Sequence, residues 1–233
     1  MEKTGKPFFT IITSTLNVID TIERCVKSVA EQTFRDYEHI IVDGASTDGT
    51  VEFLNSRKEL FSVLISEPDT GIYNAWNKAL KYVRGEWVLF LGADDILADE
   101  NVLAEVAKYI ELNAIDTGMV YGDILFVRKG SYEEIECVSI PVADLCSKPQ
   151  LGGVLPRRPQ HPAVFHHRQL FFDLGLFDEN FKILADSKFM IYAICQNKVC
   201  VHHVPIIINK MTVGGLSFRV GYKLVRENMK IQI

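Results

Sequence analysis

A short apolar run that ends directly in two carboxylates is the feature that most constrains this sequence. Five apolar or aromatic residues, Trp87 to Leu91, predict a buried strand, and Gly92-Ala93-Asp94-Asp95 follow at once. Carboxylates beside a buried strand are costly unless they meet solvent, a cation or a ligand. Ligands bind at the carboxyl ends of strands in open α/β sheets, and Mg²⁺ is often held by one or two carboxylates with substrate phosphates. This corner therefore predicts a metal–diphosphate site in an α/β fold, with Mg²⁺ or Mn²⁺ as the ion.

Strand-like and helical stretches alternate along the first half of the chain, which implies a mostly parallel sheet with helices on both faces. The second half is less regular, with a small antiparallel strand and a long loop. Strands are expected at 8–14, 37–42, 61–66, 87–91, 119–126, 135–140 and 199–208, and helices at 51–60, 72–83, 102–112, 168–174 and 186–196. A further helix follows the first strand, and an Asp20–Glu23 capping box is expected to open it.

Composition and charge exclude several classes of protein. Hydrophobic residues make up 48% and charged residues 24% of the chain, so it is globular, and the net charge of -5 argues against a general nucleic-acid binder. No stretch approaches the apolar length of a membrane span, and the N-terminal residues lack the core of a signal peptide. The five cysteines, odd in number and without CxxC spacing, favour reduced core thiols in a cytoplasmic protein over a disulfide scaffold or a zinc site.

Polar residues also follow the first two predicted strands. Thr15 and Asn17 close the first, where they can hydrogen-bond a base or a ribose, and neither a GxGxxG motif nor a Gly-rich basic loop is present there. Asp43 ends the second strand, ahead of a turn-rich loop that contains Ser46. Taken alone, each segment is better explained as a turn that caps a helix. Taken together with Asp94 and Asp95, they predict a shared crevice.

A third polar segment, Asp69-Thr70-Gly71, precedes the helix predicted from residue 72. Asp69 or Thr70 can cap that helix, and Gly71 permits a close approach of the backbone. Amide groups at this helix start could therefore face a diphosphate. Trp76 and Ala79 on the same helix are expected to pack in the core.

In this order the segments resemble the inverting family 2 glycosyltransferases with the GT-A fold. The resemblance spans roughly residues 7–217, and it rests on Phe8–Asn17, Val42–Thr50, Asp69–Ala75, Leu89–Asp95, His161, Gly175–Asp178 and Ala185-Asp186. It implies a single GT-A (Rossmann-like) domain over residues 1–233. Its mostly parallel central sheet would be flanked by helices, with a smaller antiparallel portion on the acceptor side. Residues 7–126 would form the nucleotide-sugar-binding half, 127–217 the acceptor half and 218–233 a basic tail.

The resemblance also implies roles for single residues. Asp186, at the start of its helix, is implied as the catalytic base, although Asp is equally favoured there as an N-cap. Asp43 is implied to contact the nucleoside. The nucleotide-binding surface would comprise Thr15, Asn17, Asp43, Ser46, Asp69 and Asp94. Asp94 and Asp95 are the implied metal ligands. Many relatives in this family carry Asp where this chain has Gly92, so Asp94 is expected to be the first metal ligand. Asp95 is expected to bind the metal, the sugar or a backbone amide.

Several basic residues have weaker expectations. His161 and Arg158 are the expected acceptor or phosphate contacts, and His161 is as well explained as a surface loop histidine. The paired histidines at 166–167 and 202–203 point to opposite strand faces and are expected to be structural. Arg157, Arg219 and Lys223 could meet phosphates, although exposed basic residues are more often solvated. Residues 211–218, with two adjacent glycines, form a candidate lid or a plain linker.

The resemblance thus implies transfer of a sugar from a nucleoside diphosphate donor to an acceptor hydroxyl, with inversion. UDP-sugar is the expected donor, and a hexosyl- or N-acetylhexosaminyltransferase the expected class. A glycan or lipid-linked glycan of a surface polysaccharide is the expected acceptor, and nucleic acid is not an expected partner. The enzyme is expected in the cytoplasm, with its basic tail against the inner face of the membrane.

Two other classes remain open. One is a catalytically silent nucleotide-sugar-binding protein, which would have no use for a carboxylate at Asp186. The other is a nucleotidyltransferase, which the missing basic Gly-rich loop disfavours.

Overall fold

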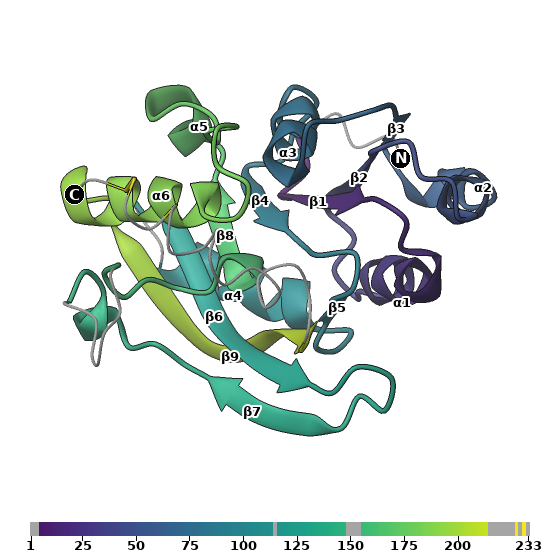
Figure 1. The fold of residues 1–233 in the computed structure, drawn as a ribbon. Coiled ribbons are helices and arrows are strands. Elements are labelled where there is room, and N and C mark those ends of the chain that lie inside the picture. Colours follow the sequence, from purple (N-terminus) through teal and green to yellow (C-terminus); the bar gives the residue numbers. More distant parts are fainter. Residues whose placement is uncertain (1–4, 114–115, 148–154, 214–226, 228–229, 232–233) are drawn as a thin grey trace.

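The computed structural model describes residues 5–113, 116–147, 155–213, 227 and 230–231. Within these residues a nine-stranded sheet runs in the order β3-β2-β1-β4-β8-β6-β9-β5, with β7 paired to β6 off this path (Figure 1). The strands are β1 (Phe9–Thr15), β2 (Tyr37–Asp43), β3 (Val63–Ser66), β4 (Trp87–Phe90), β5 (Ile96–Leu97), β6 (Met119–Val127), β7 (Glu134–Val138), β8 (Val164–His167) and β9 (Val201–Thr212). The helices are α1 (Ile19–Ala30), α2 (Thr50–Asn55), α3 (Ile72–Leu80), α4 (Val102–Asn113), α5 (Gln169–Asp173) and α6 (Ala185–Ile191).

The first four strands form the parallel part of the sheet. β1 lies between β2 and β4, so the chain builds outward from β1 to β3 and then returns to add β4 on the other side. This reversal of strand order is a topological switch point, where a crevice opens at the carboxyl ends of the strands. In register, Thr15 pairs with Asp43, and Asp43 pairs with Ser66. The polar ends of these strands therefore lie side by side.

The second part of the sheet is mixed. β8 is antiparallel to both β4 and β6, and β9 is parallel to β6 but antiparallel to β5. The strand predicted at 119–126 thus does not lie beside the strand at 87–91, because β8, from much later in the chain, is inserted between them. The strand predicted at 135–140 is present as β7 and is antiparallel to β6. A mostly parallel first half with a smaller antiparallel portion is confirmed.

Two apolar layers cover the two faces of the sheet. Helices α3, α5 and α6 bury their apolar residues in one layer, and α1, α2 and α4 in the other. Within β2, Ile40 and Val42 belong to the first layer and Ile41 to the second, because successive side chains point to opposite faces. A strand covered on both faces is largely apolar, as at Ile40 to Val42. The polar residues that β1 and β2 bury are paired with one another, Thr10 with Glu38 and Thr13 with His39.

Several expected helix boundaries differ from the observed ones. The capping box expected at Asp20 is wrong, because Val18 is the N-cap of α1 and Asp20 lies in its first turn. The amide of Ile19 instead donates to the Asp48 carboxylate at 3.0 Å, from the loop after β2. The helix expected at 51–60 divides into α2 and a 3₁₀ turn at Lys58–Leu60, and α6 continues as a π-helical turn at Tyr192–Gln196.

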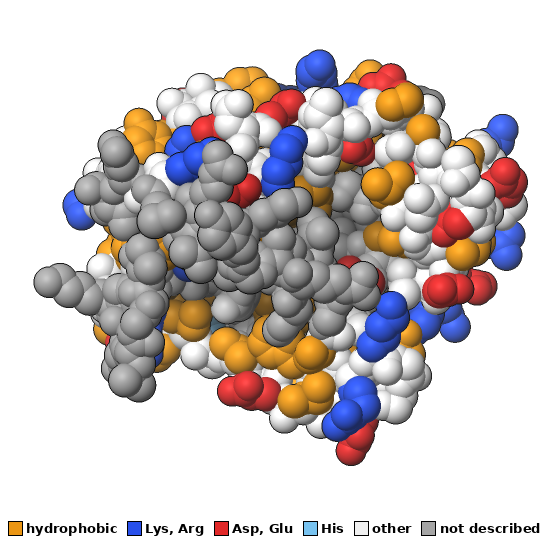
Figure 2. Space-filling model, viewed as in Figure 1, with side chains coloured by type: hydrophobic (Ala, Val, Ile, Leu, Met, Phe, Trp, Pro, Cys, Tyr) orange, Lys and Arg blue, Asp and Glu red, His pale blue; other side chains and the backbone are white. Residues whose placement is uncertain are grey.

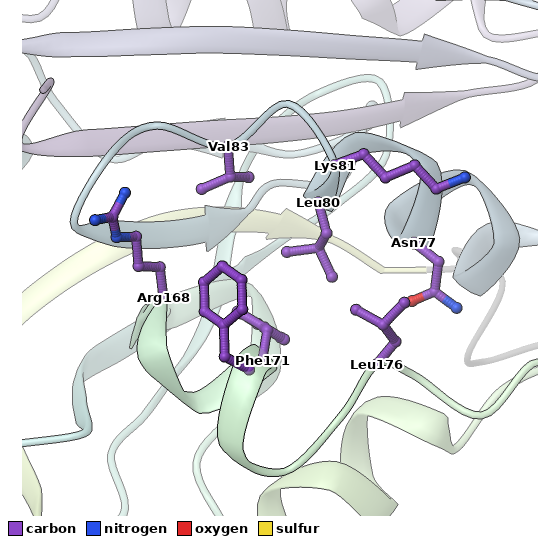
Figure 3. A pocket seen from close by; sticks show the side chains of 8 residues that line it. Asn77, Leu80, Lys81, Val83, Arg168, Phe171 and Leu176 are labelled. Atoms are coloured by element: carbon purple, nitrogen blue, oxygen red, sulfur yellow. The ribbon is translucent and has the colours of Figure 1, made fainter.

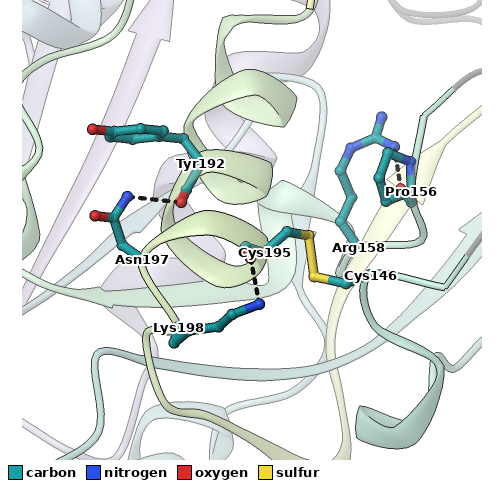
Figure 4. Close-up of a disulfide and its surroundings, with 7 residues drawn as sticks. All are labelled: Cys146, Pro156, Arg158, Tyr192, Cys195, Asn197 and Lys198. Atoms are coloured by element: carbon teal, nitrogen blue, oxygen red, sulfur yellow. Dashed lines mark hydrogen bonds between the residues drawn. A yellow bond between two sulfur atoms is a disulfide. The ribbon is translucent and has the colours of Figure 1, made fainter. Parts of the chain in front are cut away.

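The expectation of reduced core thiols is wrong. Cys146 and Cys195 form a disulfide that joins the loop after β7 to the π-helical turn after α6 (Figure 4). Of the free cysteines, Cys25 is buried, whereas Cys137 and Cys200 are exposed. Sequence spacing could not reveal this pairing, because the two partners are 49 residues apart and only the folded chain brings them together.

The described surface carries charges of both signs. On the face shown in Figure 2, Lys and Arg side chains are interspersed with Asp and Glu side chains around the visible rim. None of the helices in the described ranges is both long enough and apolar enough to cross a membrane. Arg219, Lys223, most of the expected basic tail at 218–233 and the second half of the expected lid at 211–218 lie outside the described residues.

Candidate active site

The carboxyl ends of β1 and β2 form one hydrogen-bonded cluster around Asp43. The Asp43 side chain is fully buried. Its Oδ1 accepts hydrogen bonds from Thr15 Oγ1 at 2.8 Å and Ser46 Oγ at 2.5 Å, and its Oδ2 accepts them from Ser46 N and Ser66 Oγ, both at 2.9 Å. Burial opposes ionisation, but these hydrogen bonds outweigh it, so the pKa of Asp43 lies below its ordinary value. Asp43 is therefore an ionised carboxylate at the carboxyl end of β2.

The loops after β1 and β2 are tied to each other directly above this cluster. Asn17, whose φ is 52°, donates its amide to Ser46 Oγ at 2.8 Å and accepts a hydrogen bond from Thr47 N at 2.9 Å through Oδ1. Asp69 accepts from Gly71 N at 2.8 Å just ahead of α3. Its other oxygen lies 2.6 Å from the point where a Cβ on Gly44 would stand, so only glycine fits at position 44 without displacing Asp69. Thr15, Asn17, Asp43, Ser46 and Asp69 thus line one connected region.

The acidic motif after β4 brings two carboxylates to one point. A Cβ built on Gly92 would stand 2.7 Å from Asp95 Oδ2 and 3.2 Å from Asp94 Oδ1. Asp94 is partly exposed, whereas Asp95 is 3% exposed and accepts a hydrogen bond from Thr212 N at 3.3 Å. Burial raises the pKa of Asp95 to about 8, and the Asp94 charge adds to this effect. Any side chain at position 92 would occupy the space beside the carboxylates of Asp94 and Asp95.

These two carboxylates fit a divalent cation. Hard cations prefer oxygen ligands, and Mg²⁺ keeps only one or two carboxylates when substrate phosphates and water supply the rest. In the part of the chain that the structure describes, no group of three His, Cys, Asp or Glu side chains gathers to form a complete cage. The arrangement therefore suits an ion that is shared with a substrate.

Asp186 lies in the first turn of α6, partly exposed. Its Oδ1 accepts hydrogen bonds from Tyr73 Oη at 3.0 Å and from Ser187 N at 2.7 Å. The Ser187 side chain contributes a further hydrogen bond to this carboxylate. Burial raises the pKa of Asp186 above its ordinary value, and the Ser187 amide, the positive charge of Arg158 and the Tyr73 hydroxyl oppose that shift. The carboxylate is thus oriented by Tyr73 and Ser187 and remains partly exposed.

Sequence reasoning gave Tyr73 no role, yet it is the side chain that orients Asp186. It is the second residue of α3, directly after the Asp69–Gly71 turn, and it is almost fully buried. A buried tyrosine needs a partner for its hydroxyl, and its position at a helix start beside the crevice was the available signal. The partner itself, 113 residues away, could not be deduced from the sequence.

His161 lies inside the fold and is 3% exposed. Its ring stacks on Trp76 and Phe90 at centroid distances of 4.9 and 5.2 Å, and burial lowers its pKa to about 3. Trp76 packs in the core as expected and donates its indole N–H to Ser14 Oγ at 3.1 Å. Arg158 is partly buried, and its charge acts on Asp186. Of the two expected acceptor contacts, Arg158 lies toward Asp186 and His161 lies in the aromatic core.

An apolar pocket between α3 and α5 lies apart from these residues (Figure 3). It has a volume of about 210 Å³ and is lined by residues that include Leu80, Val83, Phe171 and Leu176. Leu80 is the last residue of α3 and Val83 follows the helix, whereas Tyr73 lies at its other end. The polar cluster at the strand ends is therefore the candidate site.

Similarity to known proteins points in one direction. Residues 10–151 match the model of the family described as Glycosyl transferase family 2. A PGL/p-HBAD biosynthesis glycosyltransferase of Mycobacterium tuberculosis (strain ATCC 25177 / H37Ra) is 32% identical over 219 residues, which cover 91% of this chain and 79% of the relative. The putative teichuronic acid biosynthesis glycosyltransferase TuaG of Bacillus subtilis (strain 168) is 40% identical over 93 residues, which cover 39% of this chain and 37% of the relative.

Solved structures share the fold at lower sequence identity. S. aureus TarS 1-349 in complex with UDP-GlcNAc superposes with a TM-score of 0.72 at 21% identity, covering 96% of this chain and 66% of that one. Its complex with UDP gives 0.70 at 22% identity and 96% coverage, and this chain spans 63% of the length of that chain. The mannosyltransferase PcManGT from Pyrobaculum calidifontis, in complex with GDP-Man and Mn²⁺, gives 0.66 at 20% identity, covering 92% of this chain and 59% of that one.

Proposed function

Because this chain belongs to glycosyl transferase family 2 and has the GT-A fold, we propose that it moves a sugar from a UDP-sugar to an acceptor hydroxyl with inversion, and that Asp186 is the base. The observation that carries the proposal is the geometry of Asp186. Tyr73 and the Ser187 amide orient the carboxylate through Oδ1, and the side chain is partly exposed at the start of α6. A base has to be oriented and within reach of the acceptor, and a raised pKa brings it closer to the working pH.

The proposed reaction is a single displacement. The acceptor hydroxyl oxygen attacks the anomeric carbon, its proton passes to the Asp186 carboxylate, and the bond from that carbon to the diphosphate oxygen breaks. The bonding electron pair leaves with the nucleoside diphosphate, and the anomeric configuration inverts. Asp94 and Asp95 would hold Mn²⁺ or Mg²⁺, which when bound offsets the negative charge of the diphosphate.

The donor would lie along the cluster at the strand ends. Asp43 supplies a fixed negative charge there, and we assign it to the nucleoside, which would replace one of its present hydrogen-bond donors. Asn17, Ser46 and Asp69 complete the proposed nucleotide surface with Thr15 and Asp94. Crystal structures of TarS with UDP and with UDP-GlcNAc support a UDP-sugar, and the latter favours an N-acetylhexosamine.

The acceptor is proposed to be a glycan or a lipid-linked glycan of the cell surface, bound on the side of Arg158 and residues 127–217. The names of the relatives, which refer to PGL/p-HBAD and teichuronic acid biosynthesis, support an acceptor of this kind. The proposed location is the cytoplasm, at the inner face of the membrane.

Replacement of Asp186 by Asn tests the base. Asp186→Asn keeps the volume and the amide contact but cannot take up a proton, so turnover should fall by about 10²–10⁴-fold while UDP-GlcNAc binding and melting temperature stay near wild type. Turnover is measured as UDP release from UDP-GlcNAc, with and without added acceptor. Asp20→Asn, in the exposed first turn of α1, is the matched control. Turnover by Asp186→Asn at the wild-type rate would leave Asp186 as an ordinary helix residue.

The same assay separates the two other classes of function. A silent binding protein would bind UDP-GlcNAc and release no UDP in any mixture. A nucleotidyltransferase would incorporate labelled pyrophosphate into a nucleoside triphosphate, whereas a glycosyltransferase does not.

A further inference from the structure

A carboxylate far along the chain holds the backbone directly before Asp186. Glu227, 7% exposed, accepts hydrogen bonds from three consecutive amides. Its Oε1 accepts from Lys182 N at 2.7 Å, and its Oε2 accepts from Ile183 N and Leu184 N at 3.0 Å each. Because α6 begins at Ala185, these amides lead straight into the helix that carries Asp186.

Glu227 is the main polar partner of this backbone. Among the described residues, the amides of Lys182, Ile183 and Leu184 donate to no other acceptor. Buried amides are almost always paired, because an unpaired one loses its hydrogen bond to water without replacement. A buried carboxylate is likewise costly unless it accepts hydrogen bonds, and bonds to a charged acceptor are roughly twice as strong as neutral ones. The Glu227 carboxylate and the three amides thus stabilise each other, and this contact fixes the path of the backbone at residues 182–184.

The same stretch is linked to the other partner of Asp186. Lys182 Nζ donates to Thr70 O at 2.8 Å, just ahead of α3, and α3 carries Tyr73. After Glu227, Ile231 is 9% exposed and belongs to the same apolar cluster as Ile183 and Leu184. The segment that Glu227 contacts is therefore also held by Ile231 in the core and by the backbone just ahead of α3.

We propose that Glu227 is a positioning residue that sets the place of the Asp186 carboxylate by holding the amides of residues 182–184. The inference deepens the proposed function, since it rests on Asp186 being the base. Glu227 touches neither donor nor acceptor and acts only through the backbone. Removing it should let the start of α6 shift, and a displacement of about 1 Å at a reacting group can cost about 10²-fold in rate.

The test compares Glu227→Ala, Glu227→Gln and the control Glu111→Gln, which lies on the exposed side of α4. Glu227→Ala should lower kcat for UDP release from UDP-GlcNAc by about 10- to 100-fold, with KM for UDP-GlcNAc within about twofold. Glu227→Gln keeps one oxygen that can accept from Ile183 and Leu184, so it should restore part of the lost rate and remain folded where the Ala variant is not. Glu111→Gln should match wild type.

Two further measurements distinguish this inference from the proposed function. In an Asp186→Asn background, Glu227→Ala should lower kcat no further, because residues acting as one unit are not additive. The pKa of the Asp186 carboxyl, followed by NMR titration without any substrate, should move in both Glu227 variants and stay unchanged in Glu111→Gln. Wild-type kcat and an unmoved Asp186 pKa in both Glu227 variants would overturn the inference, whereas full activity of Asp186→Asn would overturn the assignment of the base.

Discussion

At the scale of single residues, Gly92 leaves space for the two carboxylates of the acidic motif. The point that a side chain at position 92 would occupy is already bordered by oxygens of Asp94 and Asp95. The absence of an acid at position 92 is thus matched by the buried Asp95, which points its carboxylate into the same space. Two carboxylates therefore converge at this point.

Replacing Asp94 tests the cation site. Asp94→Ala should abolish the part of UDP binding that depends on Mn²⁺, and leave the metal-free part unchanged. The fold should survive within about 0.5 kcal/mol, because no described residue donates a hydrogen bond to the Asp94 carboxylate. Titration calorimetry of UDP with and without Mn²⁺ measures both parts, with Asp20→Ala as the control. An unchanged Mn²⁺ dependence in Asp94→Ala would remove Asp94 from the proposed metal ligands.

The Tyr73 hydroxyl has a predictable effect on the pH dependence of the reaction. Burial raises the pKa of Asp186, and the Tyr73 hydroxyl opposes that shift by donating to the ionised carboxylate. Tyr73→Phe removes this hydrogen bond, so the pKa should rise further, and the ascending limb of kcat against pH should move to higher pH. The rate loss should be largest on the acidic side and should shrink as Asp186 becomes ionised at higher pH.

The control for this measurement is Tyr82→Phe, since Tyr82 is largely exposed just after the same helix. Rates are taken from UDP release with UDP-GlcNAc across the acidic and neutral range. A Tyr73→Phe variant that is slower by the same factor at every pH would contradict this account of the hydrogen bond, because such a loss points to altered packing instead.

At the scale of elements, the disulfide joins two segments that both lead to the candidate site. Cys195 belongs to the π-helical turn that continues α6. Cys146 N donates to Arg157 O at 3.0 Å, and Arg157 N donates to Ser147 O at 3.2 Å. The disulfide therefore also holds the loop segment that leads to Arg158. Figure 4 shows Arg158 and Pro156 near the bridge. The Cys146–Cys195 bond thus links the segment that leads to Arg158 with the helical segment that begins at α6.

Removing this bond should destabilise the protein measurably. The bridge closes a loop of 49 residues, for which the chain-entropy relation gives about 4 kcal/mol of stability. Cys146→Ser should therefore lower the free energy of unfolding by about that amount, and so should a thiol reductant acting on the wild type. Urea unfolding measures both, and Cys137→Ser, at an exposed free thiol, should leave the midpoint unchanged. Equal midpoints with and without reductant would mean that the bridge contributes nothing in solution.

At the scale of the whole molecule, the candidate site exists only because distant segments meet at one edge of the sheet. Asp43 is the last residue of β2, Asp94 follows β4, and Asp186 is the second residue of α6, much later in the chain. The strand order reverses at β1, which is where ligands bind in open α/β sheets. The insertion of β8 between β4 and β6 brings the second half of the chain against the first. Parallel strands with two covered faces supply the rigid base that these side chains need.

The sequence by itself determined the elements and much of the polar edge. Apolar runs such as Ile40 to Val42 have one stable environment, a strand buried on both faces, and their polar ends must then meet at the carboxyl edge. The same local patterns could not determine the strand order around β8, the Cys146–Cys195 bond, or the contacts of Asp186 with Tyr73 and of Glu227 with the amides before α6. Those pairings join residues 43 to 113 positions apart. Their energy depends on separation in space, which only the tertiary structure sets.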